Sequence, residues 1–153
     1  MSQRPIELPL EIEEIKAILP HRCPFLLVDR VLELEEDRRV LALKNVTSNE
    51  RYFIAGPGGV PTLPATILTE AMAQAGAILI LSKPAYRSHL VYFMGIERVR
   101  YRRPVVAGDR LLLRGEVLRM RGRMGHFAGT ALVDEKVVCE GKMTFALAER
   151  ARA

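Results

Sequence analysis

The segment ATILTEAMAQAGAILIL, residues Ala65–Leu81, is apolar on almost every side and carries a single charged side chain, Glu70. Pro64, directly before it, suits the start of a helix, where a missing N–H costs nothing. Because the segment is apolar nearly all round, it predicts one long helix that is buried on most sides. The preceding stretch AGPGGVP, residues 55–61, is expected to hold no regular structure and to form a mobile loop.

The rest of the chain is expected to form one short helix and several strands. Apolar residues at helical spacing predict the helix within residues 9–19, ending before Pro20. Strand-like patterns cover residues 25–35, 38–47, 89–103, 109–134 and 136–149. This order predicts an α+β fold, in which an antiparallel sheet wraps around one central helix. A single domain of residues 1–153 is expected.

Composition argues against several kinds of protein. No apolar run is long enough to cross a bilayer, and the first residues lack the apolar core of a signal peptide, so a cytoplasmic protein is expected. Cys23 and Cys139 are far apart and form no metal-binding motif, and neither do His21, His89 and His126. These residues are expected to be free thiols and core or surface histidines, with no metal and no cofactor.

Positive charge is concentrated in one part of the chain. Residues 98–123 contain nine arginines and only two acidic residues, Asp109 and Glu116, within a net charge of +5. The pattern fits a solvated face or a docking surface for an acidic protein. Nucleic acid is the weakest of the possible partners, because the chain has no DNA- or RNA-binding motif and few aromatic residues for stacking on bases.

Glu70 is the residue that most needs an explanation. Thr66, Glu70 and Gln74 are spaced four apart and fall on one stripe of the predicted helix. A buried carboxylate without partners costs several kcal/mol. Three interpretations remain open at this point: an ion pair with an arginine, exposure to solvent, or a cavity in which the carboxylate meets a ligand.

Four segments together resemble the FabZ-type 3-hydroxyacyl-acyl-carrier-protein dehydratases. They are LPHRCPFLLVDRVLELE (19–35), LKNVTSNERYF (43–53), LPATILTEAMAQAG (63–76) and FMGIERVRYRRPVVAGDRLLL (93–113). The resemblance covers most of the chain. It implies the hot-dog fold, in which the sheet wraps the long helix, and a homodimer that often assembles further into a hexamer. It also implies a role in fatty-acid biosynthesis, with acyl thioesters as substrates and the acidic acyl carrier protein as a partner.

The resemblance also assigns site residues. Dehydratases of this family combine a loop histidine of one protomer with a helix glutamate of the other, and Glu70 matches that glutamate. Substrate binding is expected at four positions, including the backbone N–H of Ala65, which would bind the thioester carbonyl: Phe53, Pro64, Ala65 and Gln74. Docking of the carrier protein is expected at Arg98, Arg100, Arg102 and Arg103. Candidates for the lining of an acyl tunnel, which fit the core equally well, are Ile67, Leu68, Met72 and Phe93.

The loop departs from the family at its catalytic position. Counting back from Glu70 without a gap, the family's histidine falls on Gly56, which has no side chain to move a proton. His21, His89, His126 and Cys23 are poor replacements, and His21 in particular is expected to be structural. Four functions stay open: a dehydratase of altered mechanism, a subunit that pairs with a histidine-bearing paralogue, a non-catalytic acyl-thioester binder, and a hot-dog thioesterase.

Overall fold

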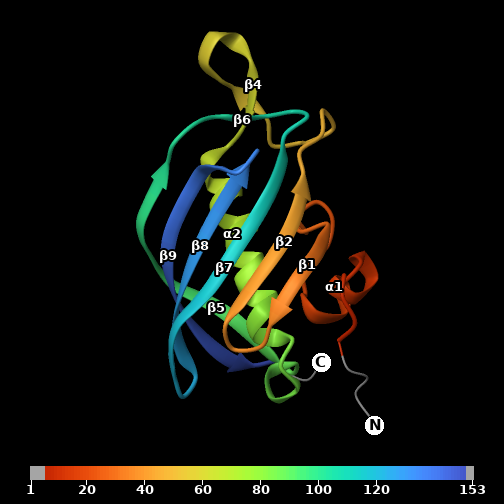
Figure 1. The fold of residues 1–153 in the computed structure, drawn as a ribbon, viewed down its shortest axis with the longest axis vertical. Helices are drawn as coiled ribbons and strands as arrows, with labels where there is room; N and C mark the ends of the chain where they lie inside the picture. Colours follow the sequence, from red (N-terminus) through yellow and green to blue (C-terminus); the bar gives the residue numbers. More distant parts are fainter. Residues whose placement is uncertain (1–5, 151–153) are drawn as a thin grey trace.

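The computed structural model describes residues 6–150, in which an antiparallel sheet curls around one long helix (Figure 1). Helix α2 (Ala65–Leu81) is the predicted central helix, and nearly every residue from Leu68 to its end is buried. Six strands form the main sheet in the order β1-β2-β7-β8-β9-β5. Their bounds are Arg30–Glu35 for β1, Arg39–Asn45 for β2, Arg110–Arg121 for β7, Met124–Val133 for β8, Lys136–Glu149 for β9 and His89–Tyr101 for β5. The predicted α+β hot-dog architecture is confirmed.

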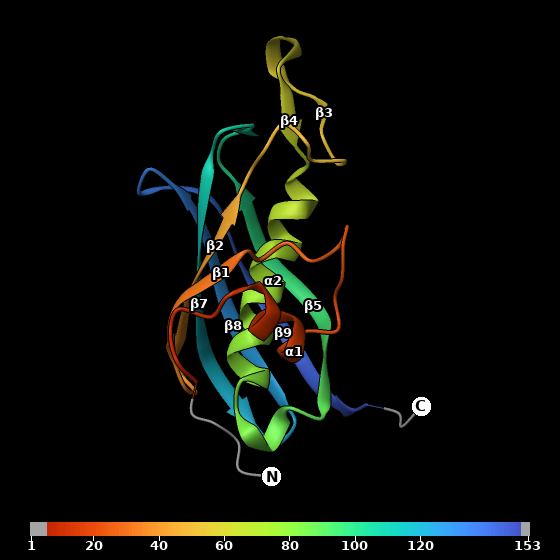
Figure 2. The same cartoon turned by 90° about the vertical axis from the view of Figure 1, so that its right-hand side faces the viewer.

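Helix α1 (Ile12–Ile18) lies against α2 and β1, on the side of α2 that the sheet leaves open (Figure 2). Glu11 and Glu14 form a reciprocal capping box at its start, which satisfies N–H groups that the helix itself cannot. Ile15 and Leu19 are fully buried and anchor it to the core. The helix ends before Pro20, as predicted.

Three strand predictions are corrected. The predicted strand of residues 25–35 begins only at Arg30, because the backbone of residues 25–27 bonds to the side chain of Gln74 instead of to a strand. Residues 109–134 form two strands, because Gly122 has φ of 60° and turns the chain back on itself between β7 and β8. Of the strand predicted at 89–103, only His89–Tyr101 is extended.

The stretch of residues 55–61 is also more regular than expected. Strands β3 (Ile54–Ala55) and β4 (Pro61–Leu63) pair across a 3-10 turn, η1 (Pro57–Gly59), and β4 also pairs with β6 (Val105–Val106). Gly58 and Gly59 have φ of 68° and 78°, which lets the chain reverse within three residues. A short hairpin therefore stands out from the body beyond the start of α2 (Figure 1). After α2, a second 3-10 turn, η2 (Pro84–Tyr86), leads into β5.

Glycines on the helix and on the sheet leave room for one aromatic ring between them. Phe127 is 1% exposed and its ring lies against Gly76 on α2 and Gly115 on β7. A Cβ atom at Gly76 would lie 2.7 Å from Cζ of Phe127, and one at Gly115 would lie 2.3 Å from it. The ring occupies the space that side chains at both positions would need, so this packing fixes the distance between α2 and the sheet.

Candidate active site

Glu70 lies near the start of α2 with 42% of its side chain exposed. The stripe predicted from the sequence runs from solvent into the core, since Thr66 is exposed, Glu70 is half-buried and Gln74 is 1% exposed. No arginine pairs with Glu70 among the described residues, so an arginine ion pair is excluded there. Its neighbours are an amide and an imidazole.

The Gln74 side chain connects Glu70 to the segment before β1. Its Nε2 donates to Oε1 of Glu70 over 2.9 Å and to the carbonyl oxygen of Phe25 over 2.6 Å. Its Oε1 accepts the backbone N–H of Leu27 over 2.9 Å. Because the amide oxygen must face that N–H donor, the orientation of the amide is determined, and its nitrogen faces the carboxylate.

His21 is the second neighbour, and it comes from the loop after α1. Its Nε2 lies 3.5 Å from Oε1 of Glu70, and 33% of its side chain is exposed. Its Nδ1 is buried without a hydrogen-bond partner among residues 6–150. The sequence predicted a structural role for this histidine and did not indicate the contact, since the two residues are far apart along the chain. The structure places it at the carboxylate.

Gly56 lies in the β3–β4 hairpin, in a position without room for a side chain. Its N–H donates to the carbonyl oxygen of Val60 over 3.0 Å, and its own carbonyl accepts the N–H of Gly59 over 3.1 Å. A Cβ atom at Gly56 would lie 2.5 Å from that Val60 oxygen and 2.3 Å from Cγ2 of Thr62. The hairpin in this conformation cannot present an imidazole from this position.

The start of α2 offers backbone N–H donors that have no acceptor within the helix. Pro64 is the N-cap residue, and its carbonyl accepts the N–H of Ile67 over 2.9 Å. Ala65 is the first residue of the helix and is partly exposed, so its N–H belongs to the donors that have no acceptor within the helix. Such donors, together with the helix dipole, suit an oxygen that carries negative charge. Phe53 is partly buried and packs against the core before the hairpin.

The tunnel candidates separate into two groups. Leu68 and Met72 are 2% and 0% exposed and belong to the core of the single chain. Ile67 and Phe93 are partly buried and lie at the edge of that core.

The four arginines proposed for docking differ in their partners. Arg102 pairs with Glu140, and Arg103 lies 3.6 Å from Asp109 and donates to its own neighbour's carbonyl, that of Pro104. Arg98 and Arg100 are exposed and have no ion pair among residues 6–150. They border a shallow groove on the outer face of the sheet together with Lys142 and Glu140, and Glu140 is the residue that pairs with Arg102. The free positive charge of this set is therefore at Arg98 and Arg100.

The two cysteines are both free. Cys23 is exposed, and Cys139 is buried on β9. Burial, together with the negative charge of Glu140, raises the pKa of the Cys139 thiol to about 11, and a hydrogen bond with Thr69 opposes this only in part. A thiol with such a pKa is protonated at neutral pH and is a poor nucleophile.

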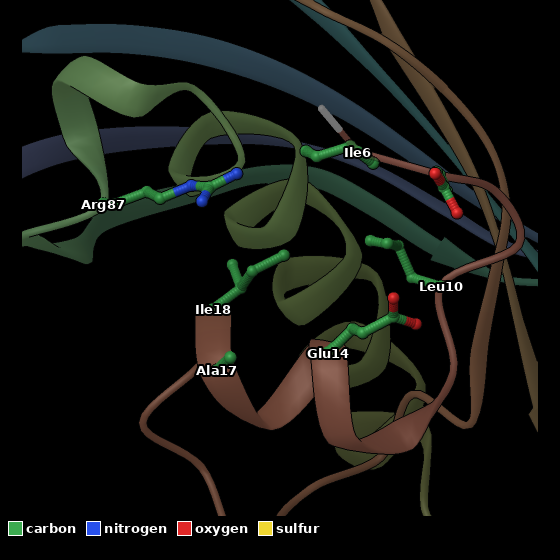
Figure 3. Close-up of a pocket in the computed structure, with 7 residues that line it drawn as sticks. Ile6, Leu10, Glu14, Ala17, Ile18 and Arg87 are labelled. Atoms are coloured by element: carbon green, nitrogen blue, oxygen red, sulfur yellow. The ribbon is translucent and has the colours of Figure 1, made fainter. Parts of the chain in front are cut away.

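A separate cavity of about 280 Å³ lies between the N-terminal segment, α1 and the turn after α2 (Figure 3). Ile18 and Leu10 provide apolar walls, while Glu14 and Arg87 provide charges at its rim. Glu70 is not one of its lining residues, so this cavity is distinct from the candidate site. None of the helices within residues 6–150 is long and apolar enough to cross a membrane.

Comparisons of this chain with a family model and with known proteins all point to the same family. The FabA-like domain matches residues 19–142. A 3-hydroxyacyl-acyl-carrier-protein dehydratase FabZ of Desulforamulus reducens is 48% identical over 141 residues, which are 92% of this chain and 99% of that protein. The FabZ of Moorella thermoacetica is 48% identical over 136 residues, 89% of this chain and 95% of that protein. Among solved structures, the dehydratase heterocomplex ApeI:P of Xenorhabdus doucetiae matches with a TM-score of 0.76 at 21% identity, over 95% of this chain and 94% of that one, which supports the fold.

Proposed function

Because the chain belongs to the FabA-like family, among the FabZ-type 3-hydroxyacyl-acyl-carrier-protein dehydratases of fatty-acid biosynthesis, we propose that it dehydrates 3-hydroxyacyl thioesters and that Glu70 carries the reaction. The observation behind this proposal is that the two oxygens of the Glu70 carboxylate have different surroundings. Oε1 of Glu70 is held by Gln74, while Oε2 has no partner among residues 6–150 and the side chain is partly open to solvent. One oxygen is thus fixed and the other is available to a substrate.

The reaction needs a base at C2 and an acid at the C3 oxygen of the substrate. In this proposal Glu70 would do both in turn: Oε2 takes the C2 proton, the C2–C3 double bond forms as the C3–O bond breaks, and the same proton completes the departing water. The N–H of Ala65 would bind the thioester oxygen, on which negative charge develops when C2 loses its proton. Pro64 and Phe53 would border the same region, next to the start of α2.

The absence of the family's histidine predicts a slow enzyme. A positioned acid or base typically contributes about 10²–10⁴-fold to a rate. Gly56 contributes no such group, so turnover is expected to lie below that of dehydratases with two proton-transferring side chains.

A second candidate function is favoured by the crowding at Gly56. The hairpin has no space for a side chain at this position, so this chain would supply only the glutamate half of a site shared between two protomers. In that case it would work as the subunit of a hetero-oligomer with a histidine-bearing paralogue.

The proposal includes an oligomer formed through β5. This strand is the last of the six-stranded sheet, so one of its edges has no strand beside it within residues 6–150. Tyr92, Met94 and Ile96 along it are 52%, 65% and 53% exposed. A second copy pairing with this edge would satisfy its free backbone N–H and C=O groups and bring the partner's own elements close to these apolar side chains. Further assembly into a hexamer, acyl carrier protein as the partner that delivers the substrate, and a cytoplasmic location belong to the same proposal.

Hydration of a short enoyl thioester by the purified protein tests the proposal, since it runs the dehydration in reverse. We expect slow turnover that Glu70→Gln abolishes, while Glu33→Gln, which changes an exposed carboxylate on β1, leaves it unchanged. Turnover only after mixing with a histidine-bearing paralogue would favour the second candidate. No turnover in either case would exclude both.

A further inference from the structure

The contact between His21 and Glu70 has a consequence for the chemistry of the site. We propose that His21 is a positioning residue, which donates from Nε2 to Oε1 of Glu70 and thereby directs the reactivity of the carboxylate to Oε2. This inference rests on the proposed function and names a second residue for it. Both residues of this contact belong to one chain, whereas the loop position is occupied by Gly56 and supplies no imidazole.

The loop after α1 is built to hold His21 in place. Nη1 of Arg22 donates to the carbonyl of Leu19 over 2.9 Å and to that of His21 over 2.7 Å, and Nη2 donates to the carbonyl of Lys16 over 3.1 Å. These bonds fix the backbone on both sides of the imidazole and connect it to the end of α1. The ring is therefore held against the carboxylate by its own loop and not only by the contact itself.

The two ring nitrogens have different surroundings, and this determines which one carries the proton. Nδ1 is buried without a partner, whereas Nε2 faces Glu70. A buried N–H without an acceptor is rarer in proteins than an acceptor that lacks a donor. The neutral imidazole is therefore expected to keep its hydrogen on Nε2, where it points at Oε1 of Glu70.

Two donors then meet the same carboxylate oxygen. Gln74 approaches Oε1 along the helix at 2.9 Å, and His21 approaches it from the loop at 3.5 Å. Contacts of this length often tighten once a substrate has excluded water. With Oε1 occupied by both, the proton from C2 can only go to Oε2, and it returns from there to the leaving hydroxyl. His21 neither gains nor loses a proton in this cycle, so the reaction balances without another reactant.

Replacing His21 with two different amides tests this role. Gln can place its amide nitrogen near the position of Nε2, whereas the shorter Asn places it near that of Nδ1. Loss of a hydrogen bond to a charged group corresponds to about 10- to 100-fold in rate. We expect His21→Asn to lower kcat for enoyl-thioester hydration by about that factor with little change in KM, and His21→Gln to restore kcat to within a few-fold of the wild type. His126→Asn, on the exposed outer face of β8, is the matched control.

Long-range ¹⁵N–¹H correlation spectra of the imidazoles provide a readout that does not depend on activity or on the stability of a variant. The expected result is the Nε2–H tautomer for His21, and an Nδ1–H tautomer would overturn the proposal. Wild-type turnover that both His21 variants match would also overturn it while leaving the proposed function intact. Absence of turnover in the wild type would instead remove the proposed function of the chain alone, and this inference with it.

Discussion

Gln74 and Glu70 are joined by a hydrogen bond of 2.9 Å along one face of α2, and the same amide of Gln74 also bonds to the backbone of Phe25 and Leu27. The carboxylate is thereby connected to the segment between α1 and β1. A change at Gln74 should therefore disturb both the fold and the reactive group.

Gln74→Glu is expected to lower the free energy of unfolding by about 3–5 kcal/mol, because it leaves a buried carboxylate without a counter-charge beside Glu70. Gln74→Met removes the bonds to Phe25 and Leu27 without adding charge, and about 1–3 kcal/mol is expected for it. Urea denaturation followed by circular dichroism measures both. A Gln74→Glu variant as stable as Gln74→Met would contradict the expected cost of a second carboxylate at this buried position.

Gly56→His is expected not to raise the rate of enoyl-thioester hydration, even though it restores the residue that the family has in this loop. The new Cβ atom would lie 2.5 Å from the carbonyl oxygen of Val60, so the β3–β4 hairpin has to change its shape before the imidazole can be accommodated. The rate and the melting temperature should be measured together, with Ala55→Ser as the control at an exposed neighbouring position. Turnover that rises by about 10²-fold or more would show that the hairpin rearranges easily.

The fold could be predicted from the sequence to the extent that it depends on local pattern. The apolar segment Ala65–Leu81 and the alternating strands predicted the helix and the sheet that wraps it. The strand prediction for residues 25–28 was wrong. A run of Phe, Leu and Val is typical of a strand, but here the backbone bonds to the side chain of Gln74, a residue distant in the sequence. The reversal at Gly122 was missed because only a φ of 60° distinguishes it from a glycine within a strand.

The sequence could predict only the part of the site that lies on a single helix. Glu70 and Gln74 lie four residues apart on one helix, so their proximity followed from helical spacing. The approach of His21 depends on how the loop after α1 packs against α2, and no local pattern encodes it. The crowding around Gly56 likewise depends on the pairing of β3 with β4, which the sequence did not suggest.

Gly76→Ala is expected to destabilise the protein although alanine is the better helix former. The substitution favours the helix by about 1 kcal/mol, but the added methyl group would lie 2.7 Å from Cζ of the buried Phe127 ring. Overpacking of this kind costs about 1–3 kcal/mol. Denaturation of Gly76→Ala, Phe127→Leu and the double variant gives a double-mutant cycle.

In that cycle the smaller Leu side chain should leave room for the methyl group added by Gly76→Ala and so reduce the loss in free energy of unfolding that this methyl group causes. The double variant should therefore be more stable than the sum of the single effects predicts. Effects that simply add would contradict the proposed collision between the helix and the Phe127 ring.

The raised pKa of the Cys139 thiol predicts that the protein loses stability at alkaline pH. Its thiol pKa is raised to about 11 in the folded chain from an ordinary 9.0, so the folded protein holds this proton more tightly than the unfolded chain does. The contribution of this thiol to the free energy of unfolding is complete below pH 9 and declines as the pH rises from 9 to 11. Urea denaturation across this range should show the decline, and Cys139→Ala should show a smaller one.

The same environment should protect the thiol from reagents. With a thiol-specific reagent at mildly alkaline pH, Cys23 should react in the native protein, and Cys139 should react only after denaturation. Rapid labelling of Cys139 in the native state would contradict its burial.

Arg98 and Arg100 are expected to determine the affinity for a carrier-bound substrate without affecting a free one. Arg102 and Arg103 form ion pairs with Glu140 and Asp109, whereas Arg98 and Arg100 form none among the described residues, although Arg100 lies opposite Glu140 on β9. Replacing both unpaired arginines with Glu should raise KM for an enoyl thioester on acyl carrier protein by about 10-fold or more, since like charges across an interface cost several kcal/mol. The small enoyl-pantetheine thioester lacks the acidic protein and should show an unchanged KM.

Salt provides an independent check on this docking surface. Exposed charges are screened over about 8 Å at physiological ionic strength, so KM for the carrier-bound substrate should rise with added salt in the wild type and respond weakly in the Arg98→Glu/Arg100→Glu variant. Arg102→Glu/Arg103→Glu is the matched control, because it changes the net charge by the same amount at arginines already paired with Glu140 and Asp109, and it should have the smaller effect. If this control weakened binding of the carrier-bound substrate as much as Arg98→Glu/Arg100→Glu, the surface would be a broad positive field, and the two unpaired arginines would have no special role in it.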